Sequence, residues 1–189
     1  MSGRRVARVG AGLCTVLALV GFGAYEYWAL ALDHFATIRA GEAYRSGAMP
    51  PEKLLATVHD YGIRTVVDLR RDRADVEAER ALLAQAGVRH INVPSAQVPD
   101  AQTVDAFLAA VSDPANRPVL IHCEHGVGRA PLFEAIYRIE LLGWDPESAR
   151  SSARWRSGLG AFEPEDPKGH FLQSYEPRRR ADVAGPPPG

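Results

Sequence analysis

One short stretch of the sequence, VLIHCEHGVGRAPL at residues 119–132, brings together a cysteine, two histidines, two glycines and an arginine. Its apolar start is typical of a buried strand and the residues from Arg129 onward are typical of a helix, so Cys123 and Arg129 flank a strand–loop–helix turn. Backbone N–H groups of such a turn, with the amino end of the helix, bind anions and favour a thiolate. A guanidinium can hold two phosphate oxygens. The stretch therefore predicts a phosphate-binding loop with Cys123 as nucleophile and Arg129 as ligand.

The five residues between Cys123 and Arg129 complete this predicted site. Two glycines among them allow a tight turn and a close approach of the backbone to a ligand. We expect substrate contacts from the whole loop, Glu124, His125, Gly126, Val127 and Gly128. His125 either touches the substrate or is solvated, and Glu124 is either a proton donor or a solvated loop residue.

Three polar residues beside the loop could support it. We expect His122 to hold the loop by hydrogen bonds to neighbouring backbone groups. Asp68 and Arg70, in the sequence DLR, either brace the loop from a strand end or pair with each other.

Strand and helix patterns alternate along the chain on both sides of the loop. Short apolar or β-branched runs predict strands at residues 63–70, 88–94 and 117–122. Apolar residues at helical spacing, closed by glycines or opened by capping residues, predict helices at residues 50–62, 75–87, 100–113, 129–143 and 145–157. This order is typical of an α/β fold with a central, mainly parallel sheet flanked by helices. We place the domain at residues 42–176, after a linker at 33–41 and before a tail at 177–189 whose proline and glycine content indicates disorder.

The first 32 residues have the pattern of a membrane-targeting segment. Arginines in residues 1–8 precede an uncharged run of 17 residues from Val9 to Tyr25, and a spanning helix needs roughly 17–25. We expect a cytoplasmic segment at 1–8 and a transmembrane signal anchor or signal peptide at 9–32. The arginines then place the domain outside the cytoplasm, in the periplasm of a bacterium, or secreted after cleavage. A buried helix of a soluble protein is the alternative.

Composition excludes several classes of function. The net charge is −1, so no broad basic field favours nucleic acid. The two cysteines, Cys14 and Cys123, are too few for a disulfide framework and too far apart for a zinc site.

The loop resembles the signature of the protein tyrosine phosphatase superfamily, which is His-Cys, five residues and then Arg. The segment that starts AYRSGAMPPEKLL and runs through the DLR strand resembles the opening of the dual-specificity branch, and VPSAQVPDAQTVDAFLAAV stands where that branch has its acid loop and the next helix. The resemblance covers about residues 42–157. It implies a phosphomonoester hydrolase in which Cys123 forms a phosphocysteine, Arg129 and the loop amides hold the equatorial oxygens, a carboxylic acid protonates the leaving oxygen, and no metal or cofactor takes part.

Two residues depart from the family pattern. A serine or threonine that follows the loop arginine in the family, and helps the thiolate to leave, is Ala130 here. The position expected for the general acid holds Ser95, which cannot serve. Asp100, the nearest carboxylate, is our catalytic candidate, and its alternative is an ordinary helix N-cap.

The resemblance leaves the substrate open among phosphorylated proteins, small phosphomonoesters and phospholipids. We favour broad or tyrosine-type phosphatase activity, and the predicted anchor suggests a phospholipid phosphatase as the second choice. The two departures favour a pseudophosphatase that binds phosphorylated partners without turnover. A rhodanese-like domain and a thiol redox protein are further alternatives, although Cys123 has no nearby partner cysteine.

Overall fold

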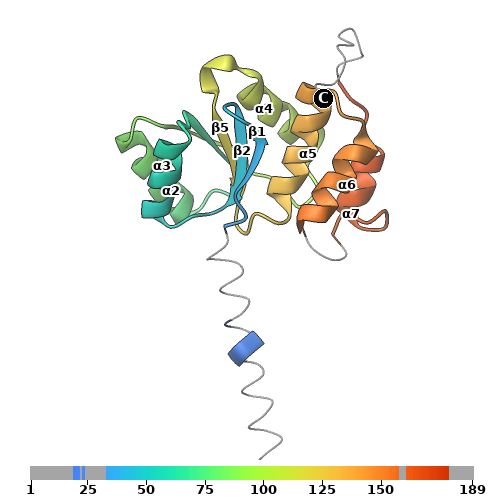
Figure 1. The fold of residues 1–189 in the computed structure, drawn as a ribbon, viewed down its shortest axis with the longest axis horizontal. Helices are drawn as coiled ribbons and strands as arrows, with labels where there is room; N and C mark the ends of the chain where they lie inside the picture. The colour runs from blue at the N-terminus through green and yellow to red at the C-terminus, as the bar shows by residue number, and fades with distance from the viewer. Residues whose placement is uncertain (1–18, 22, 24–32, 158–160, 179–189) are drawn as a thin grey trace, which may run out of the picture. The chain divides into compact units, whose positions relative to one another are not determined.

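Figure 1 shows the fold in a computed structural model of the chain, which describes residues 19–21, 23, 33–157 and 161–178. The chain divides into two compact units, residues 1–33 and 34–189, and every element below belongs to the second. The strands are β1 (Ala36–Arg39), β2 (Ala43–Gly47), β3 (Thr65–Asp68), β4 (Arg89–Asn92) and β5 (Val119–Cys123). The helices are α2 (Pro51–Asp60), α3 (Ala74–Gln85), α4 (Ala101–Ser112), the 3-10 turn η2 (Pro114–Asn116), α5 (Arg129–Leu142), α6 (Pro146–Ser157) and α7 (Pro167–Gln173).

The five strands form one sheet in the order β1-β2-β5-β3-β4. Strands β2, β5, β3 and β4 run parallel, and only β1 pairs antiparallel, with β2. The sequences TVVD and VLIHC of the two inner strands are buried throughout, as expected for parallel strands covered on both faces. The predicted α/β fold with a mainly parallel sheet is confirmed.

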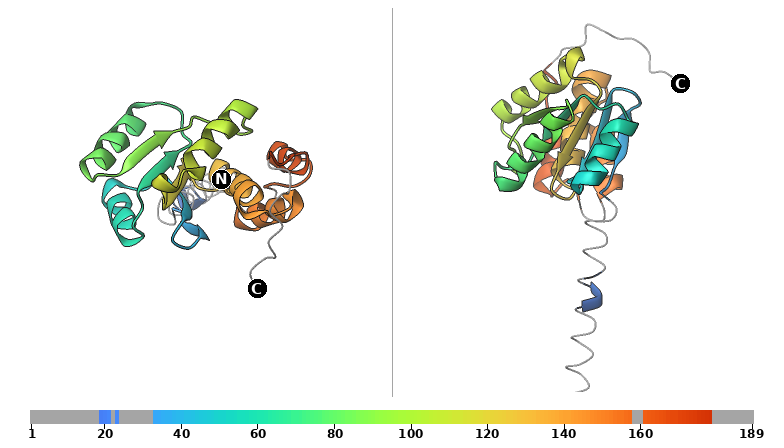
Figure 2. Two further views of the ribbon diagram at one scale, coloured as in Figure 1. Left: turned by 90° about the horizontal axis from the view of Figure 1, so that it is seen from above. Right: turned by 90° about the vertical axis from the view of Figure 1, so that its left-hand side faces the viewer.

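Helices cover both faces of the sheet (Figure 2). Helices α2 and α3 lie on one face, where Leu54 and Val58 of α2 point into a small apolar core. Helix α5 lies on the other face, and α4, α6 and α7 pack around it. All residues of α5 from Ala130 to Glu140 are buried, so this helix is the centre of the larger core. Its first residue therefore has a fixed place at the edge of the sheet.

The membrane anchor expected from the sequence is not found. Among the residues that the structure describes, no helix combines the length and the apolar character needed to cross a membrane. This finding overturns the expected localisation, a single-pass anchor with the domain outside the cytoplasm. The uncharged run was already at the lower limit of length for a span. Most of residues 1–32, on which that prediction falls, lies outside the described residues.

Two elements near the ends of the domain differ from the expectation, which gave residues 33–50 as a linker and an entry strand and no helix after residue 157. Strand β1 falls within residues 33–41, the segment expected to be the linker. Helix α7 begins at Pro167, capped by the Asp166 carboxylate, which accepts a hydrogen bond from the Lys168 amide. It has only seven residues, too few for an apolar period to stand out in the sequence. The tail predicted at 177–189 lies outside the described residues from residue 179 onward.

Candidate active site

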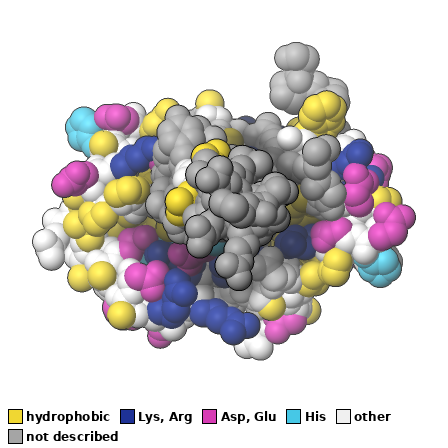
Figure 3. Space-filling view, turned by 90° about the horizontal axis from the view of Figure 1, so that it is seen from below, with side chains coloured by type: hydrophobic (Ala, Val, Ile, Leu, Met, Phe, Trp, Pro, Cys, Tyr) yellow, Lys and Arg dark blue, Asp and Glu magenta, His cyan; other side chains and the backbone are white. Residues whose placement is uncertain are grey.

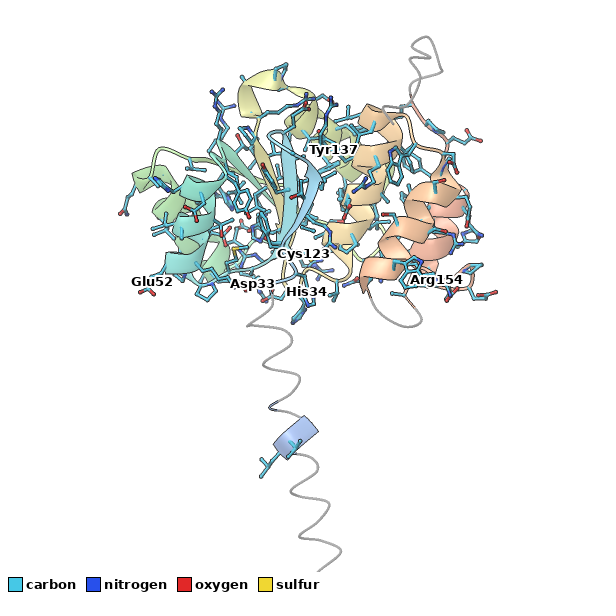
Figure 4. All side chains as sticks on the ribbon, in the orientation of Figure 1. Asp33, His34, Glu52, Cys123, Tyr137 and Arg154 are labelled. Carbon is cyan, nitrogen blue, oxygen red and sulfur yellow. The ribbon has the colours of Figure 1, made fainter. Side chains whose placement is uncertain are left out.

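The candidate site lies at the carboxyl ends of the parallel strands, the usual place for ligands in open α/β sheets. Strand β5 is the third of the five strands and ends at Cys123. Cys123 pairs in register with Gly47 at the end of β2, and His122 pairs with Asp68 at the end of β3. Figure 4 labels Cys123 at this edge, between the strands and α5. Residues that are far apart in the sequence thus meet where the chain turns from β5 into α5.

The phosphate loop, residues 123–129, packs tightly against the end of β2. Gly126 has φ +73°, a left-handed backbone that favours glycine. The Ala48 amide donates to the Glu124 carbonyl at 3.0 Å, and Arg45 Nη1 donates to the Gly126 carbonyl at 3.0 Å. These bonds fix the loop against the end of β2.

A buried ion-pair chain holds Arg45 in place. Its Nε donates to Glu134 Oε2 of α5, and Glu134 Oε1 accepts from Arg138 Nε at 3.0 Å and Nη2 at 2.8 Å. All three side chains are buried. Because removal of one member leaves an uncompensated buried charge, this chain is a firm link between the loop and the core helix.

The inner side of the loop presents donors without protein partners. Within the described part of the chain, the backbone N–H groups of residues 126–129 donate to no other protein group. Those of the last residues belong to the amino end of α5, a 14-residue helix, whose dipole is positive at that end. Such a cluster of amides binds a tetrahedral anion.

The guanidinium of Arg129 is held at the closing end of the loop. Its Nη1 donates to the Leu69 carbonyl at 2.6 Å and, more weakly, to the Ser95 carbonyl at 3.4 Å. These two carbonyls belong to segments that follow β3 and β4. The remaining N–H groups of the fork are available to an anion on the loop.

A cleft of about 210 Å³ opens beside the loop. Cys123 is 3% exposed at the end of β5 and is not among the residues that line the cleft, whereas the adjacent Glu124 and the closing Arg129 are. The cleft is lined by Arg70, Arg71, Arg73, Ser95, Ala96, Gln97, Glu124 and Arg129. The combination of a buried thiol, a ring of amides and a fixed guanidinium fits a phosphate group with its ester oxygen toward the cleft.

The sequence is similar to known phosphatases over most of its length. A protein-family model described as "DSP-PTPase phosphatase fused to NAD+ Kinase" matches residues 31–162. The chain belongs to this dual-specificity phosphatase family. This match confirms the resemblance of the chain to the dual-specificity branch of the protein tyrosine phosphatase superfamily.

Relatives of the family agree with this assignment. The dual-specificity protein phosphatase TpbA of Pseudomonas aeruginosa is 34% identical over 137 residues, which are 70% of this chain and 60% of that protein. The chain thus spans about three-fifths of the length of that relative. A crystal structure of P. aeruginosa TpbA is 30% identical with a TM-score of 0.59, and the match covers 79% of this chain and 91% of that one. A cysteine-to-serine variant of TpbA in complex with phosphotyrosine is 28% identical with a TM-score of 0.61, over 75% of this chain and 84% of that one.

A more distant structure shares the fold. The core catalytic domain of the PP-IP phosphatase SIW14 from S. cerevisiae, in complex with citrate, has a TM-score of 0.66 at 21% identity. The match covers 76% of this chain and 86% of that chain. It supports the phosphatase fold of the second unit.

The loop that carries the acid in the family lines the cleft without a carboxylate. Ser95 is buried and its hydroxyl donates to the Ala96 carbonyl at 2.8 Å. Asp100 is exposed and caps α4, where its Oδ1 accepts from the Thr103 amide at 2.7 Å. This hydrogen bond lowers the pKa of Asp100. Asp100 is not among the residues that line the cleft, whereas Glu124 is.

Several residues near the loop were missed by sequence reasoning. Gln97 and Lys168 both lie close to Gly128, where a Cβ would meet Gln97 Oε1 at 3.5 Å and Lys168 Cε at 3.8 Å. Arg71 and Arg73 add positive charge to the cleft, although Arg73 also pairs with Glu124 at 2.8 Å. Figure 3 views this edge of the domain and shows basic and acidic side chains interspersed. No motif marks these positions, because they approach the loop only through the fold.

Of the residues expected to support the loop, His122 differs from the prediction, and Asp68 and Arg70 follow one of the two alternatives. Among the described residues, His122 makes no hydrogen bond to a backbone group. Its Nε2 lies 2.9 Å from Glu79 Oε1 of α3. Asp68 and Arg70 pair with each other, with Arg70 Nη2 2.8 Å from Asp68 Oδ2, and both are buried.

The charged groups around Asp68 and Arg70 shift the pKa values of Asp68 and Glu79. Burial alone raises the pKa of Glu79, but the imidazoles of His122 and His90 and the Arg70 guanidinium outweigh burial and lower that pKa to about 2. The pKa of Asp68 is likewise held below its usual range by His90, His122 and Arg70, against the effect of burial. Both acids are therefore carboxylates at neutral pH, directly behind the strand that ends in the nucleophile.

Proposed function

We propose that the chain is a cysteine-dependent phosphomonoester hydrolase whose catalytic domain spans residues 42–176. The observation that carries the proposal is that Cys123 at the end of β5 and Arg129 at the start of α5 flank a loop whose amides at residues 126–129 have no partner among the described residues. Membership in the dual-specificity phosphatase family supports it. The structure supplies the two things that phosphoryl transfer needs most, which are positioning and positive charge.

The reaction has two steps on the loop. The Cys123 thiolate attacks phosphorus, so that an S–P bond forms while the ester P–O bond breaks and the alcohol departs. Water then attacks the phosphocysteine, the S–P bond breaks, and inorganic phosphate leaves. In both steps Arg129 and the amides of residues 126–129 stabilise the charge on the equatorial oxygens.

The departing alcohol oxygen takes its proton from a carboxyl group in the first step. Glu124 lines the cleft beside the loop and is the donor that we place first. Asp100, the candidate chosen from the sequence, would have to give up the cap of α4 to reach the cleft.

The substrate we propose is a phosphorylated protein or a small phosphomonoester, with phosphotyrosine preferred. The support comes from the TpbA relatives, named dual-specificity protein phosphatases, and from the phosphotyrosine complex of one of them. The buried position of Cys123 agrees with a long side chain that carries its phosphate to the bottom of a cleft. The alternative of a phospholipid phosphatase rested on a membrane anchor, and no helix among the described residues could cross a membrane.

A second candidate is a protein that binds phosphorylated partners without turnover. Two observations favour it: Ala130 replaces the family hydroxyl, and Glu124, the carboxylate that lines the cleft, already pairs with Arg73. Such a protein keeps the anion site and loses one or both chemical steps.

The deciding experiment is hydrolysis of para-nitrophenyl phosphate by the full chain, with the Cys123→Ser variant as control. This substrate has a good leaving group, so turnover depends little on the proton donor. Turnover that disappears in Cys123→Ser supports the hydrolase. Binding of phosphate or vanadate without turnover supports the second candidate, and activity that survives in Cys123→Ser refutes the proposed chemistry.

A further inference from the structure

A second group of chemically active side chains lies behind the phosphate loop. This polar cluster consists of Asp68, Glu79, His90 and His122. Asp68 and His122 are in register on neighbouring strands, and His90 of β4 lies opposite Val66 of β3. Because side chains alternate along a strand, all three strand residues share the face of the sheet that α2 and α3 cover. Glu79 of α3 completes the cluster, on the opposite face of the sheet from Cys123.

The spacing of the four groups matches the ligands of a metal ion. One oxygen or nitrogen atom from each residue lies within 4.8 Å of all the others. His90 Nε2 lies 3.4 Å from Asp68 Oδ2 and 3.5 Å from Glu79 Oε1, and His122 Nε2 lies 2.9 Å from Glu79 Oε1 and 3.7 Å from Asp68 Oδ1. A tetrahedral zinc ion with bonds of about 2.0–2.2 Å holds its ligand atoms about 3.3–3.6 Å apart. Small rotations of these side chains would therefore seat the ion.

The imidazoles have no hydrogen-bond partner outside the cluster among the described residues. Their Nε2 atoms lie at ion-pair distance from Asp68 and Glu79, and both Asp68 oxygens also accept hydrogen bonds from Arg70. His122 is 2% exposed, and the side chain of His90 is 1% exposed. Buried polar atoms in folded proteins are almost always satisfied, so a group of buried atoms whose close neighbours are one another is a candidate for a shared ligand.

Arg70 orients the carboxylates without occupying the centre of the cluster. Its Nη2 donates to Glu79 Oε2 at 2.7 Å and to Asp68 Oδ2 at 2.8 Å, which leaves Glu79 Oε1 turned toward the imidazoles. Its Nη1 donates to Asp75 Oδ2 at 3.2 Å. Asp68 and Glu79 thus share this guanidinium, whereas Asp75 also pairs with Arg73 at 3.1 Å.

We propose that Asp68, Glu79, His90 and His122 bind a divalent cation and that Zn²⁺ is the best match. Two imidazole nitrogens with two carboxylate oxygens suit zinc, whereas Mg²⁺ and Ca²⁺ prefer oxygen ligands throughout. The site takes no part in the phosphoryl chemistry proposed above. It joins β3, β4, β5 and α3 at their common edge and fixes the residue that precedes Cys123.

Titration of the chelator-treated full chain with Co²⁺, a spectroscopic substitute for zinc, tests the proposal. We expect one equivalent to bind with the visible absorption of a tetrahedral site and to be displaced by Zn²⁺. His90→Gln and Glu79→Gln are expected to weaken binding at least about tenfold. His59→Gln is the matched control because the His59 side chain is 89% exposed on α2, and it is expected to bind as the wild type does.

The thiol of Cys123 is the competing ligand, so Cys123→Ser is titrated in parallel and is expected to keep the site. Absence of Co²⁺ binding by the wild type, unchanged binding in both cluster variants, or loss of binding in Cys123→Ser each overturns the proposal. X-ray absorption of the zinc-loaded wild type avoids the folding of variants altogether. Nitrogen and oxygen neighbours at about 2.0 Å support the site, and a sulfur neighbour overturns it.

Discussion

Gly126 of the phosphate loop lies against Gly47 at the end of β2, so closely that a Cβ on Gly126 would stand 2.6 Å from the Gly47 nitrogen. A Cβ on Gly47 would in turn meet the His125 carbonyl carbon at 3.0 Å. Both neighbours are backbone atoms, which cannot turn away as a side chain can. The shape of the loop therefore depends on a contact between two glycines that are 79 positions apart in the sequence.

Gly126→Ala is expected to lower kcat/KM by roughly 100-fold, because displacement of catalytic groups by about 1 Å costs that much. Gly87→Ala is the matched control. Gly87 has nearly the same φ, +72°, and a Cβ there meets nothing within 4 Å, so it carries the backbone strain without the clash. Steady-state kinetics and thermal unfolding of both variants separate the two effects. Equal activity in the two variants would show that the contact does not shape the site.

Arg129→Lys is expected to lower kcat/KM at least about 100-fold while the melting temperature changes little. Lysine keeps the charge but has no planar fork, so it cannot bond the Leu69 carbonyl and two phosphate oxygens together. Arg73→Lys, on the exposed rim of the cleft, serves as control. Near-normal turnover in Arg129→Lys would mean that the guanidinium serves only the fold.

Ala130→Ser is expected to increase the rate of the second step, with kcat rising at least about tenfold. Ala130 is fully buried behind the arginine at the start of α5, and a hydroxyl there restores the family residue that helps the thiolate to leave. The measurement is the pre-steady-state burst of para-nitrophenol. We expect a burst in the wild type that shrinks in Ala130→Ser. A wild type without a burst would show that dephosphorylation of the cysteine is not the slow step.

The strand–loop–helix turn was predictable because its signals are local. A buried apolar run, loop glycines and the onset of a helix all fall within residues 119–132, and the alternation of elements predicts the parallel sheet. The support of the loop was not predictable in the same way. Arg45 reaches Gly126 across 81 positions, and Glu79 reaches His122 only after α3 has packed on the sheet. Contacts between residues so far apart in the chain produce no periodic pattern in the sequence.

The general acid shows a second limit of sequence reasoning. Carboxylates that precede a helix serve as N-caps and as proton donors alike, so the pattern VPD could not separate the two roles of Asp100. The distinction needs the position of the cleft, which Glu124 lines and Asp100 does not.

Glu124→Gln is expected to lower kcat/KM roughly 100-fold on a phosphoserine peptide and to change hydrolysis of para-nitrophenyl phosphate little. The alkoxide of serine is a poor leaving group that needs a proton, whereas nitrophenolate leaves unaided. Asp100→Asn is the matched control, because asparagine keeps the cap on the Thr103 amide. If Asp100→Asn instead loses the serine substrate selectively, Asp100 is the donor and the acid loop moves during catalysis.

Tyr175 connects the C-terminal end of the domain to α5 through a hydrogen bond to Glu140. This bond requires the phenol proton, so it depends on pH. The Tyr175 hydroxyl donates to Glu140 Oε1 at 2.7 Å, and Arg178 Nη1 donates to the Tyr175 oxygen at 2.6 Å. Burial raises the pKa of the Tyr175 phenol, and the neighbouring Glu140 carboxylate raises it further. The folded chain thus holds the phenol proton to a higher pH than the unfolded chain, in which tyrosine titrates near pH 10.

The stabilisation from Tyr175 is therefore complete below about pH 10 and is lost as the pH rises through the higher native pKa. Tyr175→Phe is expected to be less stable than the wild type by about 1–3 kcal/mol at pH 8, the usual range for a hydrogen bond to a charged group. Urea unfolding of both proteins between pH 8 and pH 11 measures this difference in the free energy of unfolding. We expect this difference to decrease above pH 10, because only the wild type carries a phenol that can ionise and lose its stabilising hydrogen bond. A difference that stays constant over this range would show that the proton on Tyr175 contributes nothing to the stability of the fold.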